Sequence, residues 1–430
     1  MYQLKFTLKQ HTPLIHFQHD QDGATLRATE VKPKLDSFII KKLQLTERRT
    51  DNGMVKTSPK NEYSPYFMGE GINCLALNYK IKITAGNAVP DLCTDIELDY
   101  TSNAGRSIPE KFPGFFGLMG DDNKNTKKFV MHDLITIEIF CIVKDLRDKI
   151  RDNIAEFFMK HNFGMRQSKG FGSFYIFEDD ENYKSHSANE IRLPYWFDLT
   201  LSPQNKNLKA KRPEVFRLQF ELFENISLFY AVLRNGVNLY KGQNNPLLYI
   251  KSMLFLYAKS IGIQWEKRKI KEVFFLNELN DQKFNHQNSE VLNYTSNNAQ
   301  LMRDVFGLAS DSDWKFPYND VISKTSGTID RYQSPILFKP ISTGTNKFRV
   351  YFDAVNENDE FYNQPFVVSA KYKKNKFSIN TPGQFDFSAF FKYVFSINLE
   401  DIAVFDEENP PREFKILSRL FSQVKQNAGF

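Results

Sequence analysis

A short stretch near the middle of the chain, residues 161–173 (HNFGMRQSKGFGS), combines glycines with cationic and hydroxyl side chains. Glycine allows positive φ and a close approach of another backbone. Exposed N–H groups, guanidinium, ammonium and hydroxyl groups all suit phosphate oxygens. These residue types therefore favour contact with the phosphates of a nucleic acid. The residues that would make the contact are Gly164, Arg166, Ser168, Lys169, Gly170, Gly172 and Ser173.

The same pattern also fits an ordinary glycine-rich connection between a helix and a strand. The order G-x-x-x-x-G-K-[ST] of a nucleotide P-loop is absent, and the stretch follows a predicted helix instead of preceding one. A dinucleotide fingerprint is absent too. Phosphate contact and plain packing both remain open as interpretations of this stretch.

The elements on either side of the loop can be predicted from apolar spacing. Leu146, Ile150, Ile154 and Phe157 recur at intervals of three and four, which predicts an amphipathic helix over residues 144–160. Residues 174–177 are typical of a short buried strand. We therefore expect a helix, a cationic glycine-rich loop and a strand, in that order.

A second cationic group lies near the N-terminus. Arg27, Lys32 and Lys34 surround Pro33, a residue suited to the first turn of a helix, and an apolar helical pattern follows. The N-terminus of a helix has unsatisfied N–H groups and favours anions. These cations are therefore further candidates for contact with an anion, and a solvated basic helix face is the alternative.

Histidines and aspartates are frequent in the segment that precedes this second cationic group: His11, His16, His19, Asp20 and Asp22. A hydrogen-bonded structural histidine and a plain turn explain these residues. The spacing of the histidines does not suit zinc, so no metal site is expected.

Composition permits a polyanionic partner without demanding one. The 430 residues contain 57 Lys and Arg against 51 Asp and Glu, a net charge of +6. Aromatic residues make up 15% of the chain, with 41 Phe and 19 Tyr. Most of these must be in the core, but a surplus could provide surfaces on which single-stranded bases stack.

The remaining global features indicate a soluble cytoplasmic protein without a membrane partner or cofactor. Cys74, Cys93 and Cys141 lack metal-ligand spacing and suit a reducing compartment. The first ten residues alternate as a strand and do not form a signal peptide, and no apolar stretch has the length of a membrane span.

The order of predicted elements indicates an α+β fold. Residues 1–180 follow the order β, α, β, β, α, β of a ferredoxin-like arrangement with insertions, and residues 193–430 are predicted to form a second, more divergent module. Within these modules, residues 46–65 are predicted to be a flexible loop and residues 216–223 a strand. Residues 277–300 are rich in Asn, Gln and Ser, which indicates a mobile insertion.

A short internal echo favours two related modules. The sequence FGLMGD at residues 116–121 is similar to FGLASD at residues 306–311, and each copy precedes strand-like segments. Because the echo spans only a few residues, chance similarity of two aromatic turns is the alternative.

These motifs together resemble the RAMP superfamily, the repeat-associated proteins of CRISPR–Cas systems. The loop FGMRQSKGFGS resembles the glycine-rich signature of that family, and HTPLIHFQHDQDGATLRATEVKPKL (residues 11–35) is similar to its first strand and the turn into its first helix. FFGLMG and VFGLAS are similar to a Phe-Gly turn found in many members, and Gln333-Ser334-Pro335-Ile336 is similar to the Ser-Pro step that follows it. The tandem arrangement resembles the double-module subunits of type III (Cmr-like) effector complexes.

The resemblance implies a fold similar to the RNA recognition motif in each module. It also implies that the chain binds guide RNA or single-stranded target RNA and assembles with other effector subunits. A non-catalytic RNA-binding subunit is the main hypothesis, and a guide-processing or target-cleaving endoribonuclease is the alternative. For that alternative, the resemblance implies either a histidine as general acid or base, with His11, His16 and His19 as candidates by position, or a loop aspartate that holds a divalent metal ion, with Asp20 and Asp22 as candidates. His16 and Asp22 are the catalytic candidates of the alternative. The chain has EVKPK at residues 30–34 where the family has Gly-Ser-Ser-x-Lys-Gly, so the resemblance does not imply the role of the repeated backbone subunit.

Overall fold

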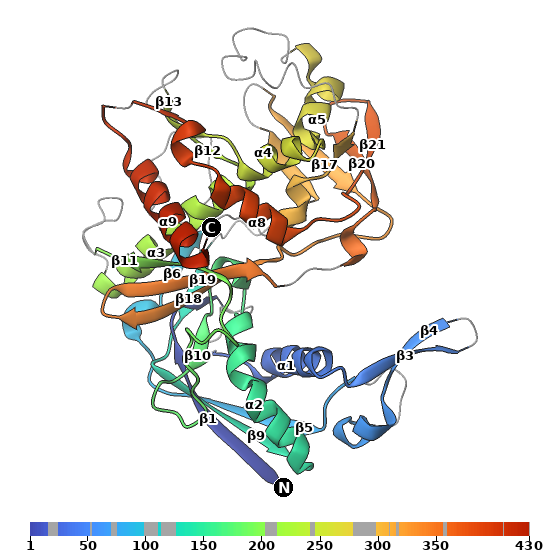
Figure 1. Cartoon of the computed structure of the whole chain (residues 1–430), viewed down its shortest axis with the longest axis vertical. Coiled ribbons are helices and arrows are strands. Elements are labelled where there is room, and N and C mark those ends of the chain that lie inside the picture. Colours follow the sequence, from blue (N-terminus) through green and yellow to red (C-terminus); the bar gives the residue numbers. More distant parts are fainter. Residues whose placement is uncertain are drawn as a thin grey trace. The chain divides into compact units, whose positions relative to one another are not determined.

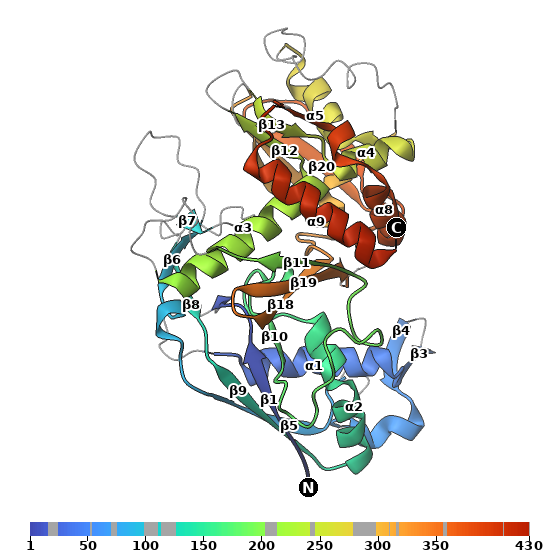
Figure 2. The same ribbon diagram turned by 60° about the vertical axis from the view of Figure 1, so that its left-hand side comes forward.

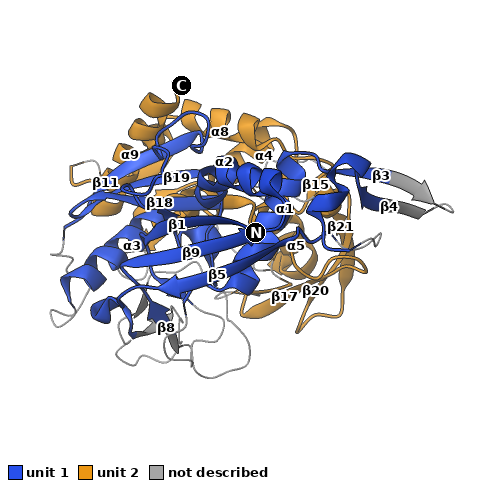
Figure 3. Cartoon of the chain, turned by 90° about the horizontal axis from the view of Figure 1, so that it is seen from below, with its two compact units in different colours: residues 1–227, 337–352 blue, residues 228–336, 353–430 orange. Residues whose placement is uncertain are grey.

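The computed structural model describes residues 1–15, 25–51, 54–69, 75–98, 111–112, 126–202, 213–240, 246–277, 298–308, 310–314, 318–355, 359–406 and 408–429. The chain divides into two compact units. Unit 1 contains residues 1–227 and 337–352, and unit 2 contains residues 228–336 and 353–430 (Figure 3). The predicted modules, 1–180 and 193–430, have other boundaries and stay a prediction.

One sheet of unit 1 has four antiparallel strands in the spatial order β10-β1-β9-β5. Its strands and the helices between them are β1 (Tyr2–Gln10), α1 (Ala28–Lys42), β5 (Tyr79–Ala85), β9 (Leu134–Cys141), α2 (Lys144–Lys160) and β10 (Phe174–Ile176). Both helices lie on the same face of this sheet (Figures 1 and 2).

The core of unit 1 is formed between this sheet and its helices. Leu4, Phe6 and Leu8 alternate along β1 and are buried. The ring of Phe6 lies 5.9 Å from that of Phe158 on α2, in an edge-on arrangement. The apolar face of the strand, which repeats every two residues, therefore packs against the apolar face of the helix, which repeats every 3.6 residues.

Unit 1 also contains a second four-stranded sheet, a three-stranded sheet and a hairpin. The spatial order is β2-β8-β6-β7 in one sheet and β11-β19-β18 in the other, and β3 pairs with β4. Their bounds are β2 (Leu14–Ile15), β3 (Thr46–Asp51), β4 (Met54–Pro59), β6 (Asp95–Leu98), β7 (Lys111–Phe112), β8 (Thr126–Val130), β11 (Tyr195–Thr200), β18 (Ile336–Gly344) and β19 (Lys347–Ala354), with short 3-10 helices η1 (Asn61–Tyr66), η2 (Pro90–Leu92) and η3 (Gln167–Lys169).

Unit 2 is built from short strands and from helices rich in aromatic residues. One sheet has the order β14-β15-β21-β20-β17-β16 and another the order β12-β13-β22. The elements are β12 (Val237–Tyr240), β13 (Pro246–Ile250), α4 (Met253–Ser260), β14 (Gln264–Trp265), α5 (Glu266–Phe274), β15 (Ala299–Gln300), η5 (Arg303–Phe306), β16 (Asp311–Trp314), β17 (Asp320–Thr325), η6 (Asp359–Phe361), β20 (Pro365–Ala370), β21 (Lys376–Asn380), α8 (Phe387–Ser396), η7 (Leu399–Asp401), β22 (Ala403–Phe405) and α9 (Arg412–Ala428).

Two local predictions are wrong. Residues 216–223 lie in helix α3 (Glu214–Arg234), not in a strand, because the alternation was the start of a longer helical pattern that buries Phe216, Phe220 and Phe223. Residues 46–51 and 54–59 form the paired strands β3 and β4 in place of a loop, with Thr46 opposite Pro59. The Asn-Gly pair between the strands is the sequence signal for a hairpin, and it outweighs the polarity of the segment.

The α+β class is confirmed by the antiparallel sheets and separate helices of the described residues. Of the internal echo, residues 116–121 and residue 309 lie outside the described residues, as does most of the 277–300 insertion. Gly307 has φ of 113° after η5, and a Cβ there would lie 3.2 Å from the backbone nitrogen of Ser334. Across the helices of the described ranges, none combines the length and the apolar character that crossing a membrane requires.

Candidate nucleic-acid interface

The glycines of the 161–173 loop are required by close packing. Gly164, Gly170 and Gly172 have φ of 76°, 94° and 61°. A Cβ at Gly172 would lie 2.0 Å from the carbonyl oxygen of Phe163, and one at Gly164 would lie 2.4 Å from Cδ1 of Leu14. Both distances are far below van der Waals contact. These glycines therefore let the loop fold onto itself and onto the end of β2.

The second half of the loop is buried between β1 and β18. Ser173 is fully buried, and its hydroxyl donates to the carbonyl oxygen of Pro340 at 2.7 Å. Its N–H donates to Oγ1 of Thr12 at 2.9 Å, and the Thr12 hydroxyl donates to the carbonyl oxygen of Gly170 at 2.7 Å. The predicted phosphate ligands Gly170, Gly172 and Ser173 are buried in the structure and serve packing within unit 1.

An aromatic contact fastens the same part of the loop to α3. The ring of Phe171 stacks on that of Phe223, with 3.8 Å between centroids and 11° between planes. Both side chains are buried. This contact removes a large apolar area from water and explains why the loop contains a phenylalanine between two glycines.

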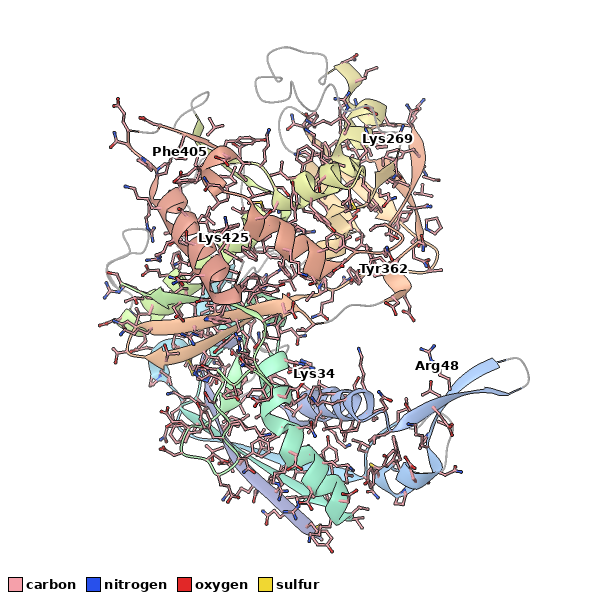
Figure 4. All side chains as sticks on the ribbon, in the orientation of Figure 1. Lys34, Arg48, Lys269, Tyr362, Phe405 and Lys425 are labelled. Atoms are coloured by element: carbon pink, nitrogen blue, oxygen red, sulfur yellow. The ribbon has the colours of Figure 1, made fainter. Side chains whose placement is uncertain are left out.

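Lys34 ties the loop to α1. Its ammonium group donates to Oε1 of Glu30 at 2.9 Å, to the carbonyl oxygen of Asn162 at 3.0 Å and to Oε1 of Gln167 at 2.6 Å. Figure 4 labels the position of Lys34. Oε1 of Glu30 also accepts from the N–H of Gly164 at 2.8 Å. Burial lowers the pKa of Lys34, and the charge of Glu30 opposes that change. Lys34 therefore positions the loop, with each of its donors directed at a protein oxygen.

The other cations of the loop are partly or largely buried. Lys169 and Ser168 are 8% and 9% exposed. Arg166 is half-buried with a left-handed backbone, φ of 60°, and burial lowers the pKa of its guanidinium to about 9. Of the predicted loop residues, Arg166 keeps more exposed surface than Ser168 and Lys169.

A groove lies between α1 and the hairpin β3–β4, and one predicted residue lines it. Its volume is about 700 Å³, and the cations on its walls are Lys32, Lys41 and Arg48. Lys41 and Arg48 are exposed, and Figure 4 labels Arg48 on the hairpin. Apolar surface comes from Ile40 and Leu75.

Lys32 is held in place within this groove. Its ammonium group donates to Oδ2 of Asp36 and to the carbonyl oxygen of Leu77, each at 2.8 Å, and lies 4.0 Å above the ring of Tyr79. Burial raises the pKa of Asp36, while the hydrogen bond from Lys32 lowers it. Arg27 is half-buried at the N-cap of α1, which begins earlier than Pro33, so the proline lies inside the helix.

Sequence reasoning missed the groove because it treated residues 46–65 as a loop. The Asn-Gly signal and the cations of TERRTD (46–51) and MVKTSP (54–59) could have identified a basic hairpin. Arg48 was absent from the predicted site for that reason, and without the hairpin Lys41 had no groove to line.

The catalytic candidates fall into two groups. His16, His19, Asp20 and Asp22 lie outside the described residues. His11 is buried, and its Nδ1 accepts from the N–H of Ser342 at 3.1 Å. Among the residues that can be described, no three His, Cys, Asp or Glu side chains gather as a metal site would need.

A cationic and aromatic cluster is present in unit 2, in the region that the sequence shows to be basic. Lys267 lies 5.8 Å from the ring of Trp314, and Lys271 lies 5.3 Å from that of Tyr318. Both rings contact Phe275, at 5.5 and 4.8 Å. Such pairs of cations and ring faces suit stacked bases and phosphates alike.

Comparison with known proteins assigns the chain to a family. Residues 1–237 match the model of the Cmr1 N-terminal domain, and residues 249–410 match that of the Cmr1 C-terminal domain. A search of curated proteins found no match. The first match alone covers more than half of the chain. The chain therefore belongs to the Cmr1 family, which confirms the predicted resemblance to the RAMP superfamily and to its type III, Cmr-like subunits.

Proposed function

We propose that this chain is a non-catalytic subunit of a type III CRISPR effector complex that binds guide RNA or single-stranded target RNA. Membership of the Cmr1 family supports the complex and the presence of other subunits as partners. The groove between α1 and the hairpin β3–β4 is the observation that supports the RNA contact.

The groove has the composition that a single strand needs. Lys32, Lys41 and Arg48 supply positive charge for the phosphates, and Ile40 and Leu75 supply apolar surface for the bases. Asp36 and Glu47 also line the groove, and the ion pair of Asp36 with Lys32 reduces the repulsion between Asp36 and phosphate. Lys41 is exposed on α1 and Arg48 on β3, so a strand bound along the groove can meet a cation from each of these two elements.

In this proposal the 161–173 loop supports the groove by holding α1 in place. Gly170, Gly172 and Ser173 hold β18 against β1, and Lys34 joins the loop to α1, which forms one wall of the groove. Arg27, Lys32 and Arg166 remain the predicted residues that we propose for phosphate contact. The loop then acts on RNA chiefly by fixing the helix that carries Lys32.

We further propose that the first module is ferredoxin-like. The order β1, α1, β5, β9, α2, β10 and the spatial order β10-β1-β9-β5 support this arrangement in unit 1. A tandem second copy would have to be assembled from the shorter sheets of unit 2, and the internal echo is its support in the sequence.

RNA binding to the groove can be tested by fluorescence anisotropy with the full chain and a labelled single-stranded RNA at several salt concentrations. The variant Lys41→Glu/Arg48→Glu is compared with Lys144→Glu/Arg151→Glu, which changes the same charge on exposed residues of α2. Loss of two phosphate contacts should weaken binding and reduce the slope of log K against log salt by about 1.4.

The control should bind like the unchanged chain. Equal loss in both double variants would show that net charge alone drives binding and would contradict the groove. No measurable binding to any single-stranded RNA would contradict the RNA-binding function itself. Incubation of the RNA with the protein, with and without EDTA, tests the non-catalytic role, and cleavage in either condition would favour the endoribonuclease alternative.

A further inference from the structure

A small cavity in unit 1 lies apart from the groove and is lined by polar and aromatic side chains. Its volume is about 200 Å³, and its walls come from β1, β10, the segment after β10 and the end of β18. This is smaller than a typical site for a drug-sized ligand and suits a fragment the size of one nucleobase. The side chains that matter are Lys9, His11, Tyr175, Glu178, Tyr183 and His186.

His11 presents an unused hydrogen-bond donor at this cavity. Its Nδ1 accepts from the N–H of Ser342, so the proton of the neutral ring is on Nε2. Nε2 is buried and has no partner among the described residues. Burial lowers the pKa of His11 well below its usual value, and the charges of Lys339 and Lys9 lower it further. The ring is therefore neutral at pH 7 and offers one donor without a charge.

Aromatic rings form another wall. The ring of Tyr175 lies 6.0 Å from that of Tyr183 and 6.3 Å from that of His186, in both cases edge to face. Nδ1 of His186 is 2.8 Å from the hydroxyl of Tyr351, which fixes the imidazole, and burial lowers the pKa of His186. Neutral, fixed rings of this kind provide stacking surfaces for an unstacked base.

Lys9 and Glu178 give the cavity both signs of charge. Lys9 stands opposite Tyr175 in the β1–β10 ladder and is half-buried, whereas Glu178 is exposed. A carboxylate repels phosphate but accepts two neighbouring N–H donors. Guanine is the base with N1–H and N2–H₂ on one edge and the acceptors O6 and N7 beside them. The set of one carboxylate, one ammonium and one neutral imidazole N–H matches that pattern.

We propose that this cavity binds a single unstacked guanine base of the RNA. In this arrangement Glu178 accepts from the Watson–Crick edge, and His11 Nε2–H and Lys9 donate to O6 and N7. The base lies against the rings of Tyr175, Tyr183 and His186. This proposal rests on the proposed RNA-binding function and adds base selectivity, which the groove does not supply.

The test compares four labelled oligouridines bound to the full chain, in which the central position is U, G, A or C. We expect the G oligomer to bind about tenfold more tightly than the all-U oligomer, as one good bidentate base contact provides. Replacing G by inosine, which lacks the N2 amino group, should remove most of the gain. Glu178→Gln should do the same without changing affinity for the all-U oligomer, whereas Asp179→Asn, an exposed neighbour outside the cavity, should leave the preference intact.

A 6-thioguanine at the central position provides an independent readout. After irradiation, cross-linked peptides containing Tyr175, Tyr183 or His186 would place the base in the cavity. RNA binding without a preference for G, a preference for another base, or cross-links elsewhere would overturn the cavity assignment alone. Absence of RNA binding by any oligomer would overturn the proposed function and this inference with it. His11→Phe is a second variant, and Glu178→Gln keeps the test valid if that variant does not fold.

Discussion

The ammonium group of Lys339 donates to the carbonyl oxygen of His161 at 2.9 Å, joining β18 to the end of α2 in unit 1. Lys339 is fully buried and also donates to Oδ1 of Asn162 at 3.1 Å and to the carbonyl oxygen of Phe174 at 2.8 Å. Its three N–H groups thus donate to three oxygens, and none of these oxygens belongs to a carboxylate.

Removing this side chain should destabilise unit 1. Lys339→Met leaves three acceptors without a donor, at about 1–3 kcal/mol for each buried unsatisfied group, partly offset by losing the cost of burying a cation. We expect a net loss of about 2–4 kcal/mol in the free energy of unfolding, measured by urea denaturation. Lys347→Met, at an exposed position of β19, should change it by less than about 0.5 kcal/mol. Equal stability of the two variants would show that the buried contacts add nothing net.

The glycine at position 172 should not tolerate a side chain. In Gly172→Ala the new Cβ would lie 2.0 Å from the Phe163 carbonyl oxygen, in addition to the strain of φ at 61°. Left-handed strain costs about 1–2 kcal/mol and overpacking about 1–3 kcal/mol, so a loss of about 2–5 kcal/mol is expected in the same assay. Gly69→Ala has φ of 89° with no atom within 4 Å of the added carbon, and it separates the two contributions because only strain remains.

Acid should weaken the fold through His161. Burial lowers its pKa to about 4, while its Nδ1 donates to the Phe157 carbonyl oxygen at 2.8 Å. The unfolded chain titrates near 6.5, so between pH 6.5 and 4 it binds a proton that the folded chain does not. The stability that the folded chain gains from keeping His161 neutral is therefore complete above pH 6.5 and is lost as the pH falls to about 4. His161→Gln should reduce the loss of unfolding free energy between pH 7 and 4.5 by roughly 2–3 kcal/mol. Parallel pH profiles would refute this account.

Unit 2 contains a buried ion pair. The loss in the free energy of unfolding should be larger when one partner is changed than when both are changed. Nζ of Lys324 lies 2.6 Å from Oδ2 of Asp304, and the two side chains are 4% and 2% exposed. Lys324→Met leaves Asp304 charged and buried near Glu266, whose pKa burial already raises. A loss of about 3–5 kcal/mol is expected, as for other broken buried pairs. The double variant Lys324→Met/Asp304→Asn should recover part of it, and a double variant as unstable as the single one would argue against a charge effect.

The sequence by itself determined the elements with clear periodicity and the family. The spacing of Leu146, Ile150 and Ile154 predicted α2, and the alternation of Leu4, Phe6 and Leu8 predicted β1, because each element has one face in the core. The glycine-rich loop was correctly predicted to connect α2 to β10, and its amino-acid sequence identified the resemblance to the RAMP superfamily. These features depend on local order, which a sequence displays directly.

Only the tertiary structure decided which of the loop's groups reach solvent. Pro340 and Phe223, far from the loop in sequence, cover Ser173 and Phe171, and no local pattern announces contacts across more than fifty residues. Lys34 appeared as a free cation in the sequence, but the oxygens of Glu30 and Gln167 occupy it in the fold. The groove likewise exists only because the hairpin β3–β4 folds beside α1. Charge and glycine content are properties of the chain, whereas exposure is a property of what packs against it.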